Sequence, residues 1–349
     1  MPVSRDEVSW CYRLILGREP ESEEAIQAHM LRDDRKSLLQ EFLSSDEFVD
    51  SAASASFRRS EGTILSLPMD VESLHIDVDV THRQLAGIIK RIKEAWEHLG
   101  ITGAHNSVLT DPQFLPENLA ESIDRFWASG VSEAEILKKT LARHGYAQIT
   151  DKICVEYGCG VGRVTVPLAK ACRHVHAYDI SKAHLSLAET RASSEATNNV
   201  TFHLCSENLA EPLQKCDIFY SRLVFQHNPP PIIKLLIQQS LRSLRPKGIA
   251  VFQVPTYISN YRFRAAQYLQ KNNVRDMEMH CLPQQVIFEI INNEECALLE
   301  VREDSSIGMP QSNTFVVKKL RDRSTPTKAS NGLGILSRLR FGGDKSSSY

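Results

Sequence analysis

Between residues 152 and 320, short apolar runs alternate with helical patterns along the chain. Runs of this kind predict buried strands when they end at turn-forming residues. The predicted strands are 153–157, 174–179, 200–205, 216–220, 249–254, 297–303 and 314–319, and the predicted helices are 163–172, 182–196, 229–244 and 283–293. Strands that alternate with helices predict a parallel sheet covered on both faces, and the last two strands predict a hairpin-like pair.

Helical patterns without strands precede this region. Residues 81–99 repeat apolar side chains at three- and four-residue steps, which predicts an amphipathic helix. Residues 100–110 are polar and irregular in pattern, so we expect a loop there. Helical patterns return at 117–128 and 132–144.

The first 50 residues have helical patterns of their own, broken at Gly17. The stretch 12–20, Tyr-Arg-Leu-Ile-Leu-Gly-Arg-Glu-Pro, and the later stretch 42–48, Phe-Leu-Ser-Ser-Asp-Glu-Phe, together resemble DUF4214, a small helical bacterial domain of unknown function. The resemblance implies an all-α domain over 1–50 and a setting beside cell-envelope glycan enzymes. The alternative is a plain helical appendage.

Two further segments have no periodic core pattern. Residues 51–62 are rich in serine and alanine, which predicts a linker that we extend over 51–80. Residues 321–349 are rich in serine, glycine and basic residues, which predicts a disordered tail. Within it, 333–341 is apolar and basic, so a weak contact with an anionic membrane surface or a protein is the alternative to an unstructured tail.

Composition and charge narrow the class of protein. A hydrophobic content of 42% and a charged content of 24% are ordinary for a soluble globular chain, and the net charge of −2 gives no electrostatic reason to expect a nucleic-acid partner. The eight cysteines contain no C-x-x-C pair, which favours reduced thiols. Because no apolar run approaches the ~18 residues of a membrane span and no secretory leader is visible, we expect a cytoplasmic protein.

One stretch carries the candidate chemistry. Gly158, Gly160 and Gly162 follow the first predicted strand of the sheet and precede a helix, so a ligand could approach backbone amides there without meeting a side chain. Dinucleotide sites use the spacing G-x-G-x-x-G, whereas here the third glycine comes one residue early and Glu156 stands before the first. Asp179 ends the second predicted strand, where a carboxylate could accept from both hydroxyls of a ribose. The glycine spacing alone leaves nicotinamide and flavin cofactors open.

The glycine loop, Asp179 and the strand order with its late pair together resemble class I S-adenosylmethionine-dependent methyltransferases over residues 145–320. The resemblance implies an α/β fold with a Rossmann-like seven-stranded sheet and helices on both faces. It also implies an enzyme with S-adenosyl-L-methionine as cofactor, and a helical lid or cap over 81–144.

The same resemblance implies the cofactor-binding residues. Glu156 would support the methionine end, Arg163 would order the loop, and Asp179 would hold the ribose. The family usually places an aspartate for the adenine amine after the third strand, where this chain has Ser206 or Glu207 instead. The full set is Glu156, Gly158, Cys159, Gly160, Gly162, Arg163, Asp179, Ile180, Ser206, Glu207 and Gln226.

His227 is the candidate general base. The sequence Phe225-Gln226-His227 resembles the family loop that lines the methyl-transfer face, and an unperturbed pKa of ~6.5 suits proton removal from a hydroxyl. The alternative is that His227 only packs on the cofactor.

The next residues allow two readings. Asn228-Pro229-Pro230 resembles the Asn-Pro-Pro-aromatic motif of amino-methylating nucleic-acid enzymes, but Pro231 replaces the aromatic. We therefore read Asn228 as the N-cap of a helix whose first turn holds the prolines.

No metal is expected, because His174 and His176 have no third ligand in the pattern and the His280-Cys281 pair stands alone. We expect the acceptor to be a small molecule or a sugar hydroxyl, in the assembly of a surface glycan. The alternatives are a nucleic-acid or protein methyltransferase, and a non-catalytic scaffold that binds the cofactor.

Overall fold

The computed structural model describes residues 3–16, 18–32, 34–45, 47, 73–206, 211–271, 277–304 and 311–321. These residues belong to two compact units, Met1–Val71 and Glu72–Tyr349. Most of the predicted linker, the predicted tail beyond 321 and the candidate Glu207 lie outside the described residues.

The described residues of the first unit form three helices, α1 (Arg5–Ile15), α2 (Glu23–Met30) and α3 (Arg35–Ser44). Each begins at a side chain that accepts a hydrogen bond from a backbone amide of the first turn; these capping residues are Ser4, Ser22 and Asp34. Tyr12 and Phe42 meet edge to face in the core, with ring centroids 4.9 Å apart. The expected N-terminal helices are therefore present, and the resemblance to DUF4214 stays a prediction.

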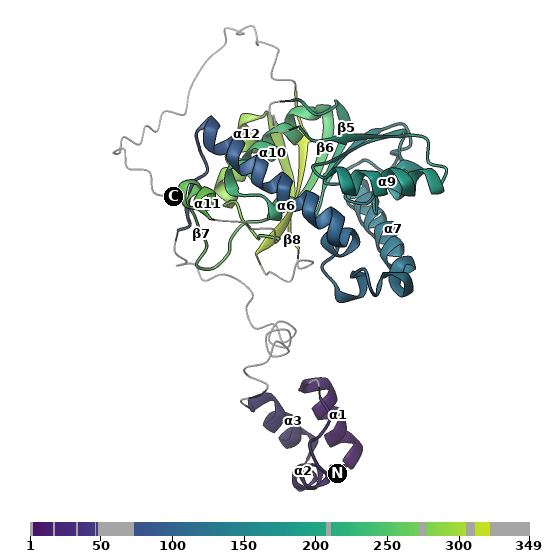
Figure 1. Ribbon diagram of the computed structural model, residues 1–349, viewed down its shortest axis with the longest axis vertical. Helices are drawn as coiled ribbons and strands as arrows, with labels where there is room; N and C mark the ends of the chain where they lie inside the picture. The colour runs from purple at the N-terminus through teal and green to yellow at the C-terminus, as the bar shows by residue number, and fades with distance from the viewer. Residues whose placement is uncertain are drawn as a thin grey trace. The chain divides into compact units, whose positions relative to one another are not determined.

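The second unit is built on a seven-stranded sheet in the order β4-β3-β2-β5-β6-β9-β8 (Figure 1). The strands are β2 (Ile153–Tyr157), β3 (His174–Asp179), β4 (Val200–Leu204), β5 (Cys216–Ser221), β6 (Leu244–Pro255), β8 (Cys296–Glu303) and β9 (Ser312–Lys319). Strands β2 to β6 are parallel, and β9 runs antiparallel between β6 and β8. This confirms the predicted Rossmann-like α/β fold with its late antiparallel pair.

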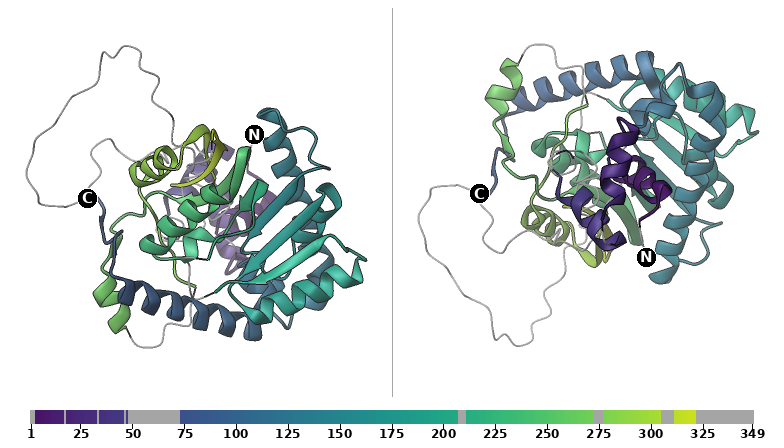
Figure 2. Two further views of the ribbon diagram at one scale, coloured as in Figure 1. Left: turned by 90° about the horizontal axis from the view of Figure 1, so that it is seen from above. Right: turned by 90° about the horizontal axis from the view of Figure 1, so that it is seen from below.

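Side chains alternate between the two faces of this sheet and build a separate core on each. Val155 and Phe219 pack in one core with residues of α6 (His82–Val108), α10 (Pro230–Ser243) and α12 (Gln284–Asn293). Cys154 and Ile218, each next to one of them in sequence, pack in the other core with α7 (Leu119–Arg143), α8 (Thr165–Ala171) and α9 (Lys182–Ser194). Figure 2 shows helices on both sides of the strands, with α6 running along one side.

The predicted loop over 100–110 is wrong, because α6 continues to Val108 with only Gly103 in a non-helical conformation. This half of α6 packs on polar partners: Gly100 lies against the hydroxyl of Ser181, and Ser107 hydrogen-bonds to His184. Contacts of this kind leave no apolar period in the sequence, which is why the helix was missed.

The two helices predicted at 117–128 and 132–144 are one helix, α7. Gly130 lies inside it, at the predicted break. A Cβ atom on Gly130 would overlap the backbone carbonyl of Arg163, so the glycine allows close approach of α7 to the loop after β2.

The second unit has a short strand pair besides the main sheet, and two further findings concern both units. A short parallel pair, β1 (His75–Ile76) with β7 (Arg262–Phe263), was not predicted, and α11 (Ala265–Gln270) follows β7. All eight cysteines are free thiols with buried side chains. None of the described helices combines the length and apolar character that crossing a bilayer requires.

Candidate active site

The loop after β2 turns on three glycines with positive φ. The angles are +79° at Gly158, +52° at Gly160 and +83° at Gly162, a region that favours glycine. The amides of Gly158 and Cys159 donate to the carbonyl of Tyr178 at 2.8 and 2.9 Å, which ties the loop to β3. A Cβ atom on Gly158 would also overlap the side chain of Val224, so both backbone conformation and space demand glycine there.

Asp179, at the end of β3, closes this loop from the other side. Its Oδ2 accepts from the amide of Gly160 at 2.8 Å, and its Oδ1 accepts from the amide of Ser181 at 2.9 Å. Each carboxylate oxygen has a second lone pair, so a ligand with two neighbouring hydroxyls could still donate to both.

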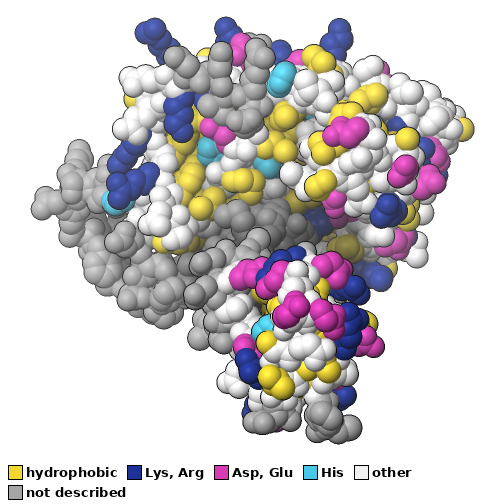
Figure 3. Space-filling view, turned by 60° about the horizontal axis from the view of Figure 1, so that its bottom comes forward, with side chains coloured by type: hydrophobic (Ala, Val, Ile, Leu, Met, Phe, Trp, Pro, Cys, Tyr) yellow, Lys and Arg dark blue, Asp and Glu magenta, His cyan; other side chains and the backbone are white. Residues whose placement is uncertain are grey.

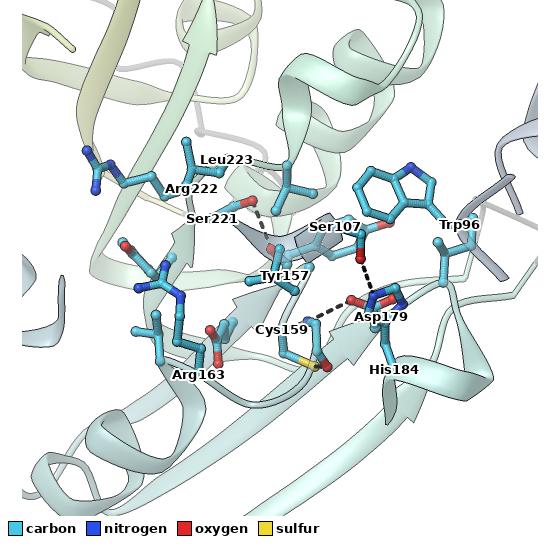
Figure 4. Close-up of a pocket in the computed structure, with 18 of the residues that line it drawn as sticks. Trp96, Ser107, Tyr157, Cys159, Arg163, Asp179, His184, Ser221, Arg222 and Leu223 are labelled. Carbon is cyan, nitrogen blue, oxygen red and sulfur yellow. Dashed lines mark hydrogen bonds between the residues drawn. The ribbon is translucent and has the colours of Figure 1, made fainter. Parts of the chain in front are cut away.

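A cavity of about 880 Å³, counted to its open mouth, lies over the loop. Seven of the predicted cofactor-binding residues line it: Glu156, Gly158, Cys159, Gly160, Arg163, Asp179 and Ile180. In Figure 4, Arg163 and Arg222 lie at one end and Asp179, Ser107, His184 and Trp96 at the other.

The other predicted residues do not line this cavity. Gly162 faces Ala188, where a Cβ atom would come within 3.2 Å, so its role is in packing the loop on α9. Ser206 follows β4, and Gln226 and His227 lie in a short 3-10 turn, Phe225–His227, beyond the rim. The structure therefore brings together the loop and strand-end residues but not the complete predicted set.

The arginine end of the cavity holds a buried network of charges. Arg222 donates from Nε and Nη2 to Asp304 at 3.0 and 3.1 Å, and from Nη1 to Glu133 of α7. Glu133 also accepts from the hydroxyl of Tyr220 at 2.6 Å, and burial raises the pKa of that phenol. Two acids thus balance Arg222, which the sequence analysis missed although it directly follows β5, where ligand-binding residues gather in such sheets.

Glu156 lies on the floor between this network and the glycine loop. Its side chain is buried, and its Oε2 accepts from the hydroxyl of Thr165 at 2.6 Å. Burial raises the pKa of Glu156 to about 7, and the hydroxyl of Thr165 and the charge of Arg163 act against that shift. Near neutral pH the group is therefore partly protonated.

Helix α6 supplies the opposite wall with Ile92, Trp96, Ser107 and Val108. The hydroxyl of Ser107 donates to the carbonyl of Ala104 and so accepts from Nε2–H of His184 at 2.8 Å. Nδ1 of His184 then keeps its lone pair, with no hydrogen-bond partner among the described residues. The resemblance implied a helical cap over 81–144, but which residues of α6 reach the cavity could not be predicted, because the contacts join segments far apart in the chain.

His227 has both ring nitrogens engaged. Nδ1–H donates to the carbonyl of Glu278 at 3.0 Å, so the Nε2 lone pair accepts from the amide of Gln226 at 3.1 Å. Burial lowers the pKa of His227 to about 4, so the ring is neutral at pH 7. Its ring centroid is 5.3 Å from that of Trp96, which reaches the cavity wall.

Asn228 does not cap α10 as predicted. Its side-chain amide donates back to the carbonyl of Val224 at 2.9 Å, and Pro229 occupies the N-cap position. The prolines 230 and 231 do open the helix, as expected. Asn228 instead lines the cavity, because the turn before α10 folds its side chain inward.

His174 and His176, which were considered for a metal, do not line this cavity. Nδ1 of His176 is 3.1 Å from Nε2 of His203, and the ring of His174 packs on that of His176. Burial lowers the pKa of His176 to about 4. Among the described residues, no three histidine, cysteine or acidic side chains are grouped so that they could hold a metal ion.

The segment that contains the glycine loop is similar to a known protein family. Residues 154–248 match a family profile described as a methyltransferase domain. No curated protein sequence matches the chain. The matched segment begins in β2 and includes the glycine loop and Asp179, so this part of the chain is a methyltransferase domain.

Solved structures with a similar backbone include three methyltransferases. Magnesium protoporphyrin IX methyltransferase from Synechocystis, with bound S-adenosylmethionine, has a TM-score of 0.47 at 16% identity and covers 70% of this chain and 99% of its own. The N-methyltransferase NodS from Bradyrhizobium japonicum has a TM-score of 0.43 at 13% sequence identity and covers 66% of this chain and 98% of its own. Phosphoethanolamine N-methyltransferase 1 from Haemonchus contortus has a TM-score of 0.46 at 13% sequence identity and covers 71% of this chain and 51% of its own.

Proposed function

We propose that this chain, an S-adenosylmethionine-dependent methyltransferase, methylates a hydroxyl of a small molecule or sugar. The observation that carries the proposal is the wall that α6 and Trp96 form across the cavity from the glycine loop. A wall so close to the donor site leaves room for a small acceptor group. Figure 3 shows hydrophobic side chains and histidines lying together on the face turned toward the viewer.

We place the cofactor with its ribose at Asp179 and its methionine end toward Arg163. Asp179 would accept from the two ribose hydroxyls, since each of its oxygens keeps a lone pair toward the cavity. Arg163 would face the methionine carboxylate, and Glu156 would accept from the ammonium group. Trp96 would then lie near the reacting methyl group, and Ser206 would be left for the adenine amine.

The cofactor supplies an activated methyl group when bound, so the protein has to align the acceptor oxygen and exclude water. His227 remains the proposed general base, held in one tautomer by the carbonyl of Glu278. Its Nε2 lone pair would become available when the side-chain amide of Gln226 moves aside. Burial, which lowers the pKa of His227 to about 4, keeps the ring neutral at pH 7 but also makes it a weaker base than an unperturbed histidine.

Replacing His227 with Asn should lower turnover by ~100-fold or more, because a positioned base contributes about that much. S-adenosylhomocysteine affinity should stay the same, since the side chain lies outside the cavity lining. Turnover is measured with labelled cofactor and affinity by calorimetry. Unchanged turnover would remove His227 from the mechanism.

Affinity for S-adenosylhomocysteine should rise as pH increases through about 7. Below the pKa of Glu156 its carboxyl is protonated and accepts poorly from an ammonium group, whereas above it the carboxylate binds the ammonium ion. Titration calorimetry between pH 6 and 8 measures the trend. Glu156→Gln should remove it, and a slope that survives this substitution would assign the proton to another group.

The remaining parts of the chain enter the proposal as follows. We place the protein in the cytoplasm, in surface-glycan assembly, with residues 1–50 as a DUF4214-like helical domain and 51–80 as a linker whose last residues enter the second unit as β1. Residues 81–144 act as lid, 145–320 as the methyltransferase domain, and 321–349 as a basic tail for weak membrane or protein contact. Residues 333–341 lie outside the described residues.

One experiment separates the acceptor classes. Tritium transfer from labelled S-adenosylmethionine into an extract is followed in glycan, nucleic-acid, protein and small-metabolite fractions. Label in glycan or small metabolites is the expected result. Label in nucleic acid or protein alone would establish the alternative enzyme, and cofactor binding without any transfer would establish the scaffold.

A further inference from the structure

Asn228 lines the cofactor cavity, although its position in the sequence predicted a helix cap. Nδ2 of its side chain donates to the carbonyl of Val224 at 2.9 Å, and this bond fixes which way the amide is turned. Oδ1 has no hydrogen-bond partner among the described residues, yet it is not sealed in as Nδ1 of His184 is. The cavity therefore has an uncharged acceptor atom that a ligand can reach.

The turn before α10 holds this side chain in place. The amides of His227 and Asn228 donate to the carbonyls of Val224 and Phe225 at 3.1 and 3.0 Å, so the turn closes on itself. The prolines 229–231 follow directly, and each proline ring fixes its own φ angle. A side chain held in this way loses little conformational entropy when it binds a ligand.

Val224 connects this turn to the glycine loop. A Cβ atom on Gly158 would come within 2.3 Å of the Val224 side chain, so the two residues are in contact. In the proposed placement of the cofactor, the loop at Gly158 lies between the ribose at Asp179 and the methionine end at Arg163. The sulfur and its methyl group join these two parts of the cofactor. Asn228 would therefore lie near the methyl group.

The other polar side chains of the lining have partners or assigned roles. The proposed function gives three of them to the cofactor: Glu156, Arg163 and Asp179. Five more form hydrogen bonds within the protein: Ser107, His184, Tyr220, Ser221 and Arg222. The indole of Trp96 can only donate. Within the described lining, Asn228 is thus the side chain that offers an uncharged and unpaired acceptor atom to a substrate.

We infer that Asn228 is an acceptor-binding residue, whose Oδ1 accepts the hydrogen bond of the hydroxyl that is methylated. This inference rests on the proposed function and names a side chain that the substrate would touch. A hydroxyl that donates its hydrogen to Oδ1 turns a lone pair of its oxygen toward the methyl group, and such alignment is what the transfer requires of the protein.

The hydrogen bond to Asn228 would strengthen as the methyl group is transferred. The hydroxyl oxygen forms the bond to the methyl carbon with its lone pair, and the electrons of the broken C–S bond stay on sulfur. Positive charge then grows on the O–H group, which makes it a stronger donor to Oδ1. The proton afterwards passes to the proposed base, because the amide of Asn228 has no ionisation near neutral pH.

Two ligands that differ at the methyl position test the role of Asn228 without any acceptor. Sinefungin carries an amino-substituted carbon in place of the methylated sulfur, whereas S-adenosylhomocysteine carries a bare sulfur there. Asn228→Ala should weaken the binding of sinefungin by ~10-fold or more and that of S-adenosylhomocysteine by less than ~3-fold, since only sinefungin loses a charge-assisted hydrogen bond. Titration calorimetry measures both affinities.

Asn228→Asp distinguishes a contact with the ligand from a structural role. A carboxylate at this position attracts the ammonium group of sinefungin, so the ratio of its affinity to that of S-adenosylhomocysteine should rise by ~3-fold or more. Loss of the bond from Nδ2 to Val224 occurs in both variants and acts on both ligands alike. Asn293→Ala, which alters an exposed side chain at the end of α12, is the control and should leave both affinities unchanged.

The outcomes are separable from those of the proposed function. An affinity ratio in Asn228→Ala equal to that of the unaltered protein, or a ratio that fails to rise in Asn228→Asp, would overturn the role of Asn228. If Asn228→Ala does not fold, the ratio in Asn228→Asp decides alone. Label transfer into nucleic acid or protein would overturn the proposed function instead, and it would leave the contact at the methyl position unaffected.

Discussion

Asp179→Ala should lower the affinity for S-adenosylhomocysteine by ~100-fold or more. Each hydrogen bond to a charged group contributes about 1.5–3 kcal/mol, and the proposed ribose contact makes two of them. The substitution also removes the acceptors for the amides of Gly160 and Ser181, so the loop loses its support. Titration calorimetry with S-adenosylhomocysteine measures the loss directly.

Two matched variants serve as controls for the proposed contact between Asp179 and the ribose. Asp179→Asn keeps the size of the side chain but loses its charge and one acceptor oxygen. Its affinity for S-adenosylhomocysteine should therefore lie between that of Asp179→Ala and that of the unaltered protein. Asp151→Ala removes an exposed carboxylate that pairs with Lys152 at the surface, and its affinity should not change. Equal affinity in Asp179→Ala and the unaltered protein would mean that the ribose assignment is wrong.

Arg222→Met should lower the free energy of unfolding of the second unit by about 3–5 kcal/mol, because removing one member of a buried ion pair leaves its partners uncompensated. The partners are Glu133 and Asp304, whose side chains are 10% and 9% exposed. For a unit of this size the melting temperature should fall by on the order of 10 °C. Differential scanning calorimetry without ligand measures both quantities.

Arg302→Met is the control for this prediction. Its side chain is 65% exposed and pairs with Glu300 at the surface, so its removal should cost less than about 1 kcal/mol. If Arg222→Met unfolds within ~1 kcal/mol of the control, water rather than Arg222 compensates the two acids. The buried network would then be no part of the fold's stability.

The strands and the glycine loop could be predicted because their signals are local, whereas the strand order rested on the family resemblance. The apolar run Ile153–Val155 and the three glycines after it lie within ten residues, so a strand and a turn could be read there, although the glycine spacing alone left the cofactor open. The arginine end could not be predicted, because the Glu133 that pairs with Arg222 lies 89 residues away in sequence. The position of Trp96 in the cavity wall could not be predicted either. The apolar period over 81–99 correctly predicted a helix, but it did not say which part of the fold the helix packs on.

The misplaced helix boundaries have the same origin. The second half of α6 forms because Ser107 meets His184 and Gly100 meets Ser181, contacts that tertiary structure alone provides. Asn228 failed as a cap because its side chain found the carbonyl of Val224 instead of an amide of the following turn. In each case a short polar side chain had a long-range or backward partner that outweighed the local preference.

Alkylation of the eight buried thiols would report where the fold opens. Cys11 is in the first unit and the other seven are in the second, spread from the loop residue Cys159 to the edge strand at Cys296. An alkylating reagent therefore meets no exposed thiol until part of the fold separates. The order in which peptides acquire the label would map the order in which the units and layers come apart, without an introduced probe.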